Sequence, residues 1–171
     1  MSKHKKKSLL GQHLTLFPDR TLFWQEEKLL VVADAHFGKA QIFREHGIPV
    51  PGGTTADDLE RLSHQMDQLQ PRKLLFLGDL IHGRIEDSND FKRSVDQWRQ
   101  RHKNVELLLA TGNHDLHSGD PPAQFRFDHV ATEIVMGSFI FTHKPRFDSS
   151  LYGIAGHLHP AVSLTGKGRL K

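Results

Sequence analysis

The stretch Val105–Asp115, VELLLATGNHD, decides the fold of this chain, because a largely apolar run ends there at three polar side chains, Asn113, His114 and Asp115. The run Val105–Ala110 predicts a strand that is covered on both faces of a sheet. Asn, His and Asp side chains are costly to bury without partners. The end of this strand is therefore predicted to be part of a functional site.

Four other segments share this design, in which an apolar run stops at a residue type that can bind a metal ion. The runs are Leu29–Ala33, Lys73–Leu77, Ser138–Thr142 and Leu151–Ala155. The polar residues that follow them are Asp34 and His36, Asp79 and His82, His143, and His157 and His159. The sequence thus predicts five strands whose polar ends meet at one edge.

The ordered motifs D-x-H, G-D, G-N-H-D, H and G-H-x-H, which this chain carries between Asp34 and His159, resemble the signature of the calcineurin-like metallophosphoesterase superfamily. A more specific resemblance, to the ligase-associated DNA repair metallophosphoesterases of the PdeM family, covers nearly the whole chain. It rests on the segments Asp34–Lys39, Phe43-Arg44, Gly47–Pro51, Gly78–His82 and Gly156–Val162.

The resemblance implies an α/β fold, a layered metallophosphoesterase sandwich built from βαβ units with sheets flanked by helices. The alternation of apolar strands with helical patterns independently favours βαβ units. Chains of the PdeM family usually continue for some tens of residues after the last motif, including a final strand, so the C-terminal part of this chain is short beside them.

Length and composition place limits on the protein class. A chain of 171 residues predicts one domain over 1–171. The resemblance implies that this is a metallophosphoesterase domain. The absence of Cys excludes disulfides and thiolate zinc sites, so any metal must be held by imidazole, carboxylate and amide oxygen. No apolar run approaches the roughly 20 residues of a membrane span, and we expect no secretory signal, because the basic N-terminal segment lacks a sufficient apolar stretch. We expect a cytoplasmic protein without membrane contact.

The basic residues near the N-terminus admit two interpretations. Residues 1–8 carry a Lys-rich run, which we expect to be a disordered tail, although such a run could also contact a phosphate backbone. The formal net charge of +3 favours polyanionic partners only mildly.

The remaining pattern predicts scaffold elements. The segment His13–Trp24 alternates around the turn Pro18-Asp19-Arg20 and predicts a hairpin. Helices are predicted from Lys39 to about His46, from Thr54 through Leu69, and from Ser88 to about His102. Loops are predicted at Gly47–Gly53 and Leu116–Asp128. The segments Phe37–Gly53 and Leu116–Asp128 are expected to form the walls of the site.

Phosphate esters resist attack because the anion repels nucleophiles and the leaving oxygen departs with difficulty. Two metal ions about 3.5–4 Å apart overcome both problems by supplying hydroxide near neutral pH and by neutralising charge. The spacing of Asp34 and His36 on extended chain would place both side chains on one side, where they could share an ion. A lone Asp or His is usually structural, but the complete ordered set argues against that interpretation here.

The superfamily resemblance assigns the site residues individually. Asp34, His36 and His159 would hold the first metal, Asn113, His143 and His157 the second, and Asp79 would bridge them. His114 would be the catalytic general acid, since a positioned imidazole can protonate a leaving alkoxide at neutral pH, and Asp115 would orient it. His82, Arg84 and Lys144 border the site and could bind substrate phosphate, although a surface role is also open.

The ligand types narrow the identity of the metal ion to a group of first-row ions. Mixed imidazole and oxygen ligation suits Mn, Fe, Zn or Co better than Mg. We expect two divalent ions and favour Mn²⁺, because enzymes that resemble this one are commonly most active with it.

The function expected is that of a metal-dependent phosphodiesterase, specifically a DNA endonuclease in repair. The DNA substrate, and partnership with a DNA ligase, a helicase and an exonuclease, are implied by the PdeM resemblance. Alternatives on the same fold are a phosphatase and a nucleotide or cyclic-nucleotide phosphodiesterase, because fold does not fix substrate. A non-catalytic interaction module is a further alternative from a different class.

Overall fold

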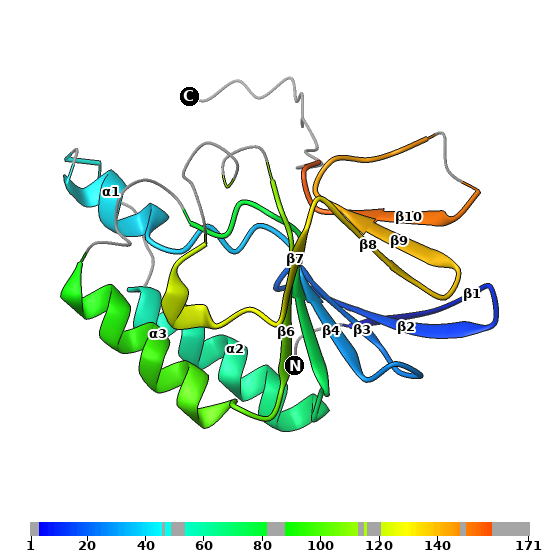
Figure 1. Cartoon of the computed structure of the whole chain (residues 1–171), viewed down its shortest axis with the longest axis horizontal. Coiled ribbons are helices and arrows are strands. Elements are labelled where there is room, and N and C mark those ends of the chain that lie inside the picture. The colour runs from blue at the N-terminus through cyan, green and yellow to red at the C-terminus, as the bar shows by residue number, and fades with distance from the viewer. Residues whose placement is uncertain are drawn as a thin grey trace, which may run out of the picture.

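A seven-stranded sheet lies between a layer of helices and a second, three-stranded sheet (Figure 1). This is a computed structural model, and it describes residues 4–45, 47–48, 54–81, 88–112, 115, 121–147 and 150–158. The mixed α/β architecture confirms the layered fold that was predicted, with helices against the large sheet.

The large sheet has the strand order β1-β2-β3-β4-β5-β6-β7. Its first four strands pair antiparallel, and β4 through β7 pair parallel. The bounds are β1 Lys5–Leu9, β2 Gln12–Phe17, β3 Thr21–Trp24, β4 Leu29–Val32, β5 Lys73–Phe76, β6 Glu106–Ala110 and β7 His129–Ala131.

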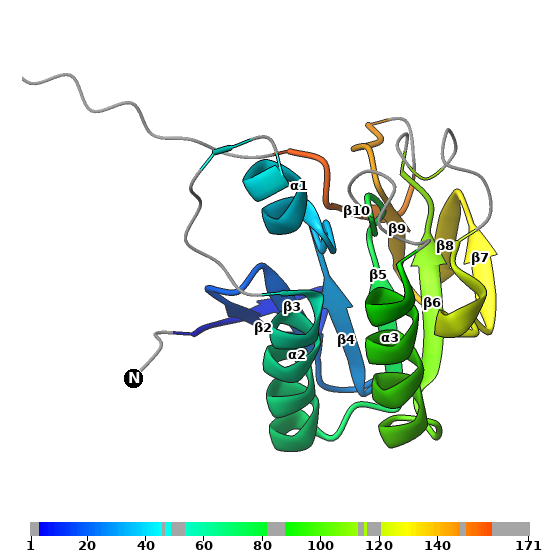
Figure 2. The ribbon, with the colours of Figure 1, turned by 90° about the vertical axis from the view of Figure 1, so that its left-hand side faces the viewer.

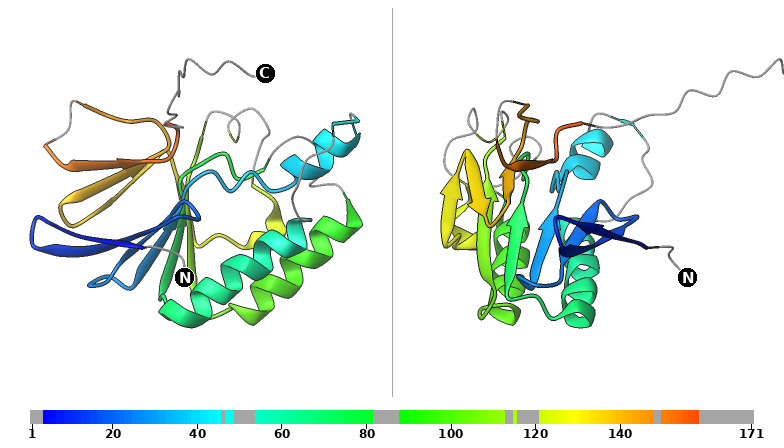
Figure 3. Two further views of the ribbon diagram at one scale, coloured as in Figure 1. Left: turned by 180° about the vertical axis from the view of Figure 1, so that it is seen from behind. Right: turned by 90° about the vertical axis from the view of Figure 1, so that its right-hand side faces the viewer.

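The small sheet has the order β10-β9-β8 and packs on the face opposite to the helices (Figure 3). Strand β9 runs antiparallel to β8 and parallel to β10. The bounds are β8 Glu133–Met136, β9 Phe139–Thr142 and β10 Tyr152–Ala155.

The helices are α1 Lys39–Glu45, α2 Thr55–Leu69 and α3 Asn89–Arg101, with a 3-10 turn, η1, at Ala123–Phe125. Figure 2 shows α2 and α3 side by side in front of the strands. None of the helices in the described part of the chain is long and apolar enough to cross a membrane.

The starts of α2 and α3 follow from local capping, as predicted. The Thr54 N–H donates to Asp57 Oδ2 at 2.6 Å and the Asp57 N–H donates to Thr54 Oγ1 at 3.4 Å, which is a capping box. The Phe91 N–H donates to Ser88 Oγ at 3.1 Å. These bonds satisfy N–H groups that have no partner within the helix.

Two apolar cores lie on the two faces of the large sheet. Between the sheet and the helices, Leu62, Val95 and Trp98 pack with Phe76 and Phe125. Between the two sheets, the ring centroids of Trp24 and Phe139 lie 4.9 Å apart, and Leu29, Leu75, Leu108 and Phe141 complete this second core. Strand β4 is buried along its whole length because both cores contact it.

The prediction of a disordered tail over residues 1–8 is wrong for the part that the structure describes. Residues Lys5–Leu9 form β1 and pair with β2, with Lys6 opposite Thr15. An edge strand can keep its Lys side chains in water while its backbone groups pair, so a Lys-rich sequence does not exclude a strand. Residues 1–3 lie outside the described part.

The prediction of a loop over Leu116–Asp128 is incomplete for the part that the structure describes. Residues 121–128 contain η1, whose Phe125 is 0% exposed and packs in the helix-side core, so this segment is not only a surface loop. Strands β7 and β8 were not predicted, because three or four residues are too few to show a period. The five polar strand ends belong to two sheets, β4, β5 and β6 in one and β9 and β10 in the other.

Candidate metal centre

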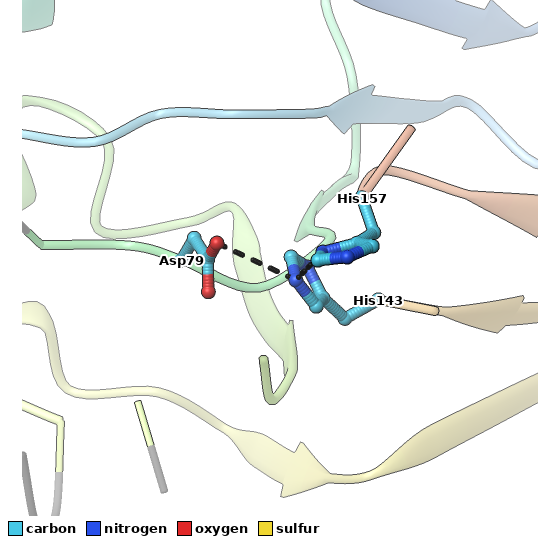
Figure 4. A group of neighbouring side chains, drawn as sticks. All are labelled: Asp79, His143 and His157. Atoms are coloured by element: carbon cyan, nitrogen blue, oxygen red, sulfur yellow. Dashed lines mark hydrogen bonds and ion pairs between the residues drawn. The ribbon is translucent and has the colours of Figure 1, made fainter. Parts of the chain in front are cut away.

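Three predicted metal ligands converge from both sheets, as Figure 4 shows. Asp79 follows β5, His143 follows β9 and His157 follows β10. Their ligand atoms lie within 4.8 Å of one another, with His143 Nε2 at 3.4 Å from Asp79 Oδ2 and at 2.9 Å from His157 Nδ1. Asp79 and His143 are buried and His157 is half-buried.

The orientation of His143 suits metal binding. Its Nδ1 lies 2.8 Å from the carbonyl oxygen of Leu77, an acceptor, so Nδ1 carries the proton and donates. The lone pair of Nε2 then faces Asp79 and His157. A backbone carbonyl that fixes the tautomer of a histidine in this way is a common feature of metal sites. One carboxylate and two imidazoles fit a divalent first-row ion.

The backbone around Asp79 turns sharply, as Gly78 predicted. Gly78 has φ +73° and Asp79 has φ +48°, so both residues lie in the left-handed region. A Cβ on Gly78 would lie 2.6 Å from His143 Nδ1, and one on Gly112 would lie 2.4 Å from Asp79 Oδ1. Glycine at these positions allows three loops to approach closely enough to form the cluster.

Asp115 joins two of these loops. Its Oδ2 accepts hydrogen bonds from the N–H groups of Asp79 and Gly112, each at 2.8 Å, and its Oδ1 accepts one from the Leu80 N–H at 3.0 Å. This arrangement holds the backbone of Asp79 against the segment that follows β6. The predicted contact of Asp115 with His114 cannot be followed, because His114 lies outside the described residues.

Asp34 and His36 lie on the neighbouring loop, but not on extended chain. Their φ values are +53° and +42°, so the argument that alternation on an extended strand places both side chains on one side was wrong. The loop runs instead beside the Asp79 segment, since the His36 N–H donates to the Asp79 carbonyl oxygen at 3.0 Å. Within the residues that the structure describes, the metal-ligand cluster contains Asp79, His143 and His157 but neither Asp34 nor His36.

The other predicted site residues remain predictions. Lys144 is exposed directly after His143. The residues that fall outside the described part are His82, Arg84, Asn113, His114 and His159.

Two features of the loops around Asp34 and Asp79 were not predicted. Arg20 Nη1 lies 3.8 Å from Asp34 Oδ2. This contact follows from the pairing of β3 with β4, which brings the Arg20 carbonyl oxygen within 3.0 Å of the Ala33 nitrogen and was not predicted. The close approach of Gly112 to Asp79 had no signal in the sequence, since it depends on how two loops pack.

Comparison with known proteins indicates the family of the chain. The family model for calcineurin-like phosphoesterases matches residues 27–167. The crystal structure of the nuclease MPE of Pseudomonas putida is similar to this chain, with a TM-score of 0.78 and 33% sequence identity, over 92% of this chain and 74% of that one. No curated protein matches.

The chain therefore belongs to the calcineurin-like phosphoesterase family, and it is a metal-dependent phosphoesterase. The resemblance to the superfamily that the motifs indicated is confirmed, and the similarity to nuclease MPE is consistent with the PdeM-like branch.

Proposed function

We propose that this protein hydrolyses phosphodiester bonds in DNA, as a two-metal endonuclease that acts in DNA repair. The observation that carries the proposal is the convergence of Asp79, His143 and His157 from three strand ends in two sheets. The description of the similar Pseudomonas putida protein as a nuclease supports a nucleic acid substrate. The net charge of +3 is compatible with a polyanion.

Seven residues would hold two divalent ions, for which Mn²⁺ is our first choice. Asp79 would bridge the ions, and the other ligands would be Asp34, His36, Asn113, His143, His157 and His159. When bound, such a pair supplies Lewis-acid charge at the phosphoryl oxygens and lowers the pKa of water near neutral pH.

The chain's own groups would complete the chemistry. His143 presents Nε2 because its Nδ1–H donates to Leu77. His114 would donate a proton to the leaving oxygen. Lys144, His82 and Arg84 would contact the substrate phosphate. Partnership with a DNA ligase, helicase or exonuclease is a proposal that rests on family resemblance. A cytoplasmic location is a proposal that rests on the lack of Cys.

The test compares hydrolysis of bis-p-nitrophenyl phosphate, a diester, with p-nitrophenyl phosphate, a monoester, in added Mn²⁺. We expect diester cleavage that Asp79→Asn lowers by more than about 100-fold, because even changes to groups that only support metal ligands cost 10–100-fold. Asp79→Asn is also the control for contaminating enzyme, whose activity would survive this change, and Asp90→Asn, an exposed change on α3, is the matched variant that should keep wild-type activity.

A protein that cleaves the diester should next be tested on single-stranded, nicked and branched DNA. Cleavage of the monoester alone would contradict the proposal and identify a phosphatase. No cleavage of either compound, together with no stoichiometric metal, would identify an interaction module.

A further inference from the structure

A pocket of about 510 Å³ opens beside Asp34 and His36. Its walls are the turn between β2 and β3, the segment that follows β4, helix α1, and α2 from Asp58 to Gln65. Figure 2 shows α1, β3 and α2 around the carboxyl end of β4. The volume lies within the range of roughly 300–1,000 Å³ that is typical of small-ligand sites.

The pocket contains three cationic side chains, Arg20, Lys39 and Arg61. Arg20 and Arg61 have exposed side chains, 61% and 76% respectively, so their guanidinium groups can reach a ligand. The apolar part of the wall includes Phe43 and Leu62. A cationic rim beside an apolar wall suits a ligand with a phosphate and a flat or sugar-like group.

Three carboxylates, Asp19, Asp34 and Asp58, also line the pocket, and a metal ion bound to Asp34 would leave two of them against the three cations. Arg61 forms an ion pair with Asp58, and the positive charge of Arg20 also acts on Asp58. Burial raises the pKa of Asp58 from its usual range, and the two arginines act in the opposite direction. Arg61 thus contacts Asp58 directly, whereas Arg20 acts on it only through its charge. Arg20 is the group that faces Asp34, at 3.8 Å, and a metal ion on Asp34 would leave it available for an anion.

We propose that this pocket, the Arg20 pocket, binds the phosphate and nucleoside next to the scissile phosphodiester, with Arg20 and Arg61 on that neighbouring phosphate. This inference rests on the proposed function, since it assumes that the reacting phosphate sits by Asp34 and His36. The site would then distinguish a nucleic acid strand, which has a phosphate on each side, from a simple diester.

The test measures binding rather than turnover. Metal-reconstituted full-length protein is titrated by calorimetry with thymidine 3′,5′-bisphosphate and with thymidine 5′-monophosphate. We expect the bisphosphate to bind about tenfold more tightly, the value of one good charge-assisted contact. Arg61→Gln should reduce this advantage to about twofold and make the salt dependence of log Kd shallower by about one unit.

Two further variants keep the result interpretable. Lys39→Gln changes a second cation of the pocket and keeps the ion pair between Arg61 and Asp58. Arg93→Gln changes an exposed arginine on α3 that does not line the pocket. The proposal predicts a reduced advantage in Lys39→Gln and the wild-type advantage in Arg93→Gln. Melting temperatures confirm that each variant is folded.

Equal affinity of the wild-type protein for the two nucleotides would overturn the proposal, as would an advantage that persists in both Arg61→Gln and Lys39→Gln. The assay with bis-p-nitrophenyl phosphate, run on the same preparations, separates this failure from failure of the proposed function. Diester cleavage without a bisphosphate advantage rejects the pocket alone. A bisphosphate advantage without cleavage of diesters rejects the phosphodiesterase function alone.

Discussion

Replacing Asp115 should loosen the loops that carry Asp79, and the size of the effect follows from three hydrogen bonds. Hydrogen bonds to a charged group contribute roughly 1.5–3 kcal/mol each, and the half-buried position of Asp115 places its bonds near the lower limit. Asp115→Ala removes all three, and we expect the free energy of unfolding to fall by about 4 kcal/mol. Asp115→Asn keeps one acceptor oxygen, and we expect a loss of about 2 kcal/mol.

The metal affinity of the site should fall as well. The Asp79 backbone is held at φ +48°, a conformation that costs a non-glycine residue roughly 1–2 kcal/mol. Without the bonds from Asp115 this segment can relax, and the carboxylate of Asp79 leaves its position beside His143. We therefore expect metal affinity to fall by about tenfold in Asp115→Asn, as for other changes to groups that position a ligand.

Urea denaturation of metal-free protein measures the stability, and calorimetric titration with Mn²⁺ measures the affinity. Asp96→Asn is the matched control, because it removes an exposed ion pair to Arg126 that is worth less than about 1 kcal/mol. An effect of Asp115→Asn on stability and on metal affinity that is no larger than that of the control would show that Asp115 does not hold the Asp79 loop. If metal affinity is unchanged but the pH profile of turnover shifts, Asp115 acts through His114, as the sequence predicted.

Two further changes test the packing of the fold. Gly112→Ala places a Cβ 2.4 Å from Asp79 Oδ1, so we expect at least tenfold weaker metal binding by calorimetry. In the control Gly153→Ala the Cβ would lie 3.5 Å from its nearest neighbour, and this variant should bind metal normally. Equal binding by both variants would contradict the close packing of Gly112 against Asp79. His102 has a pKa that burial lowers, so the unfolded state binds more protons and stability should fall as pH drops below about 6.5. Thermal melts from pH 7.5 to 5 should show a shallower loss in His102→Gln than in the wild type or in the exposed control His64→Gln, and identical slopes would refute this.

The sequence was sufficient wherever a local rule operates. Apolar runs predicted the buried strands β4, β5 and β6, and helical spacing predicted α2 and α3, because burial pattern and period are properties of a short segment. The caps at Thr54 and Ser88 were visible for the same reason. Strands β1, β7 and β8 escaped prediction, since an edge or very short strand is stabilised mainly by pairing with a distant segment.

For the site, the sequence alone determined which residue types follow the strands and that Gly78 must allow a sharp turn before Asp79. The residue types and the turn at Gly78 are local properties, because they depend on bonds and angles within a few residues. Only the tertiary structure decided that Asp79, His143 and His157 meet across two sheets, that Asp115 holds the Asp79 loop, and that Arg20 lies near Asp34. Such contacts join segments that are far apart along the chain, and their geometry is set by how the two cores pack the sheets and the helices together.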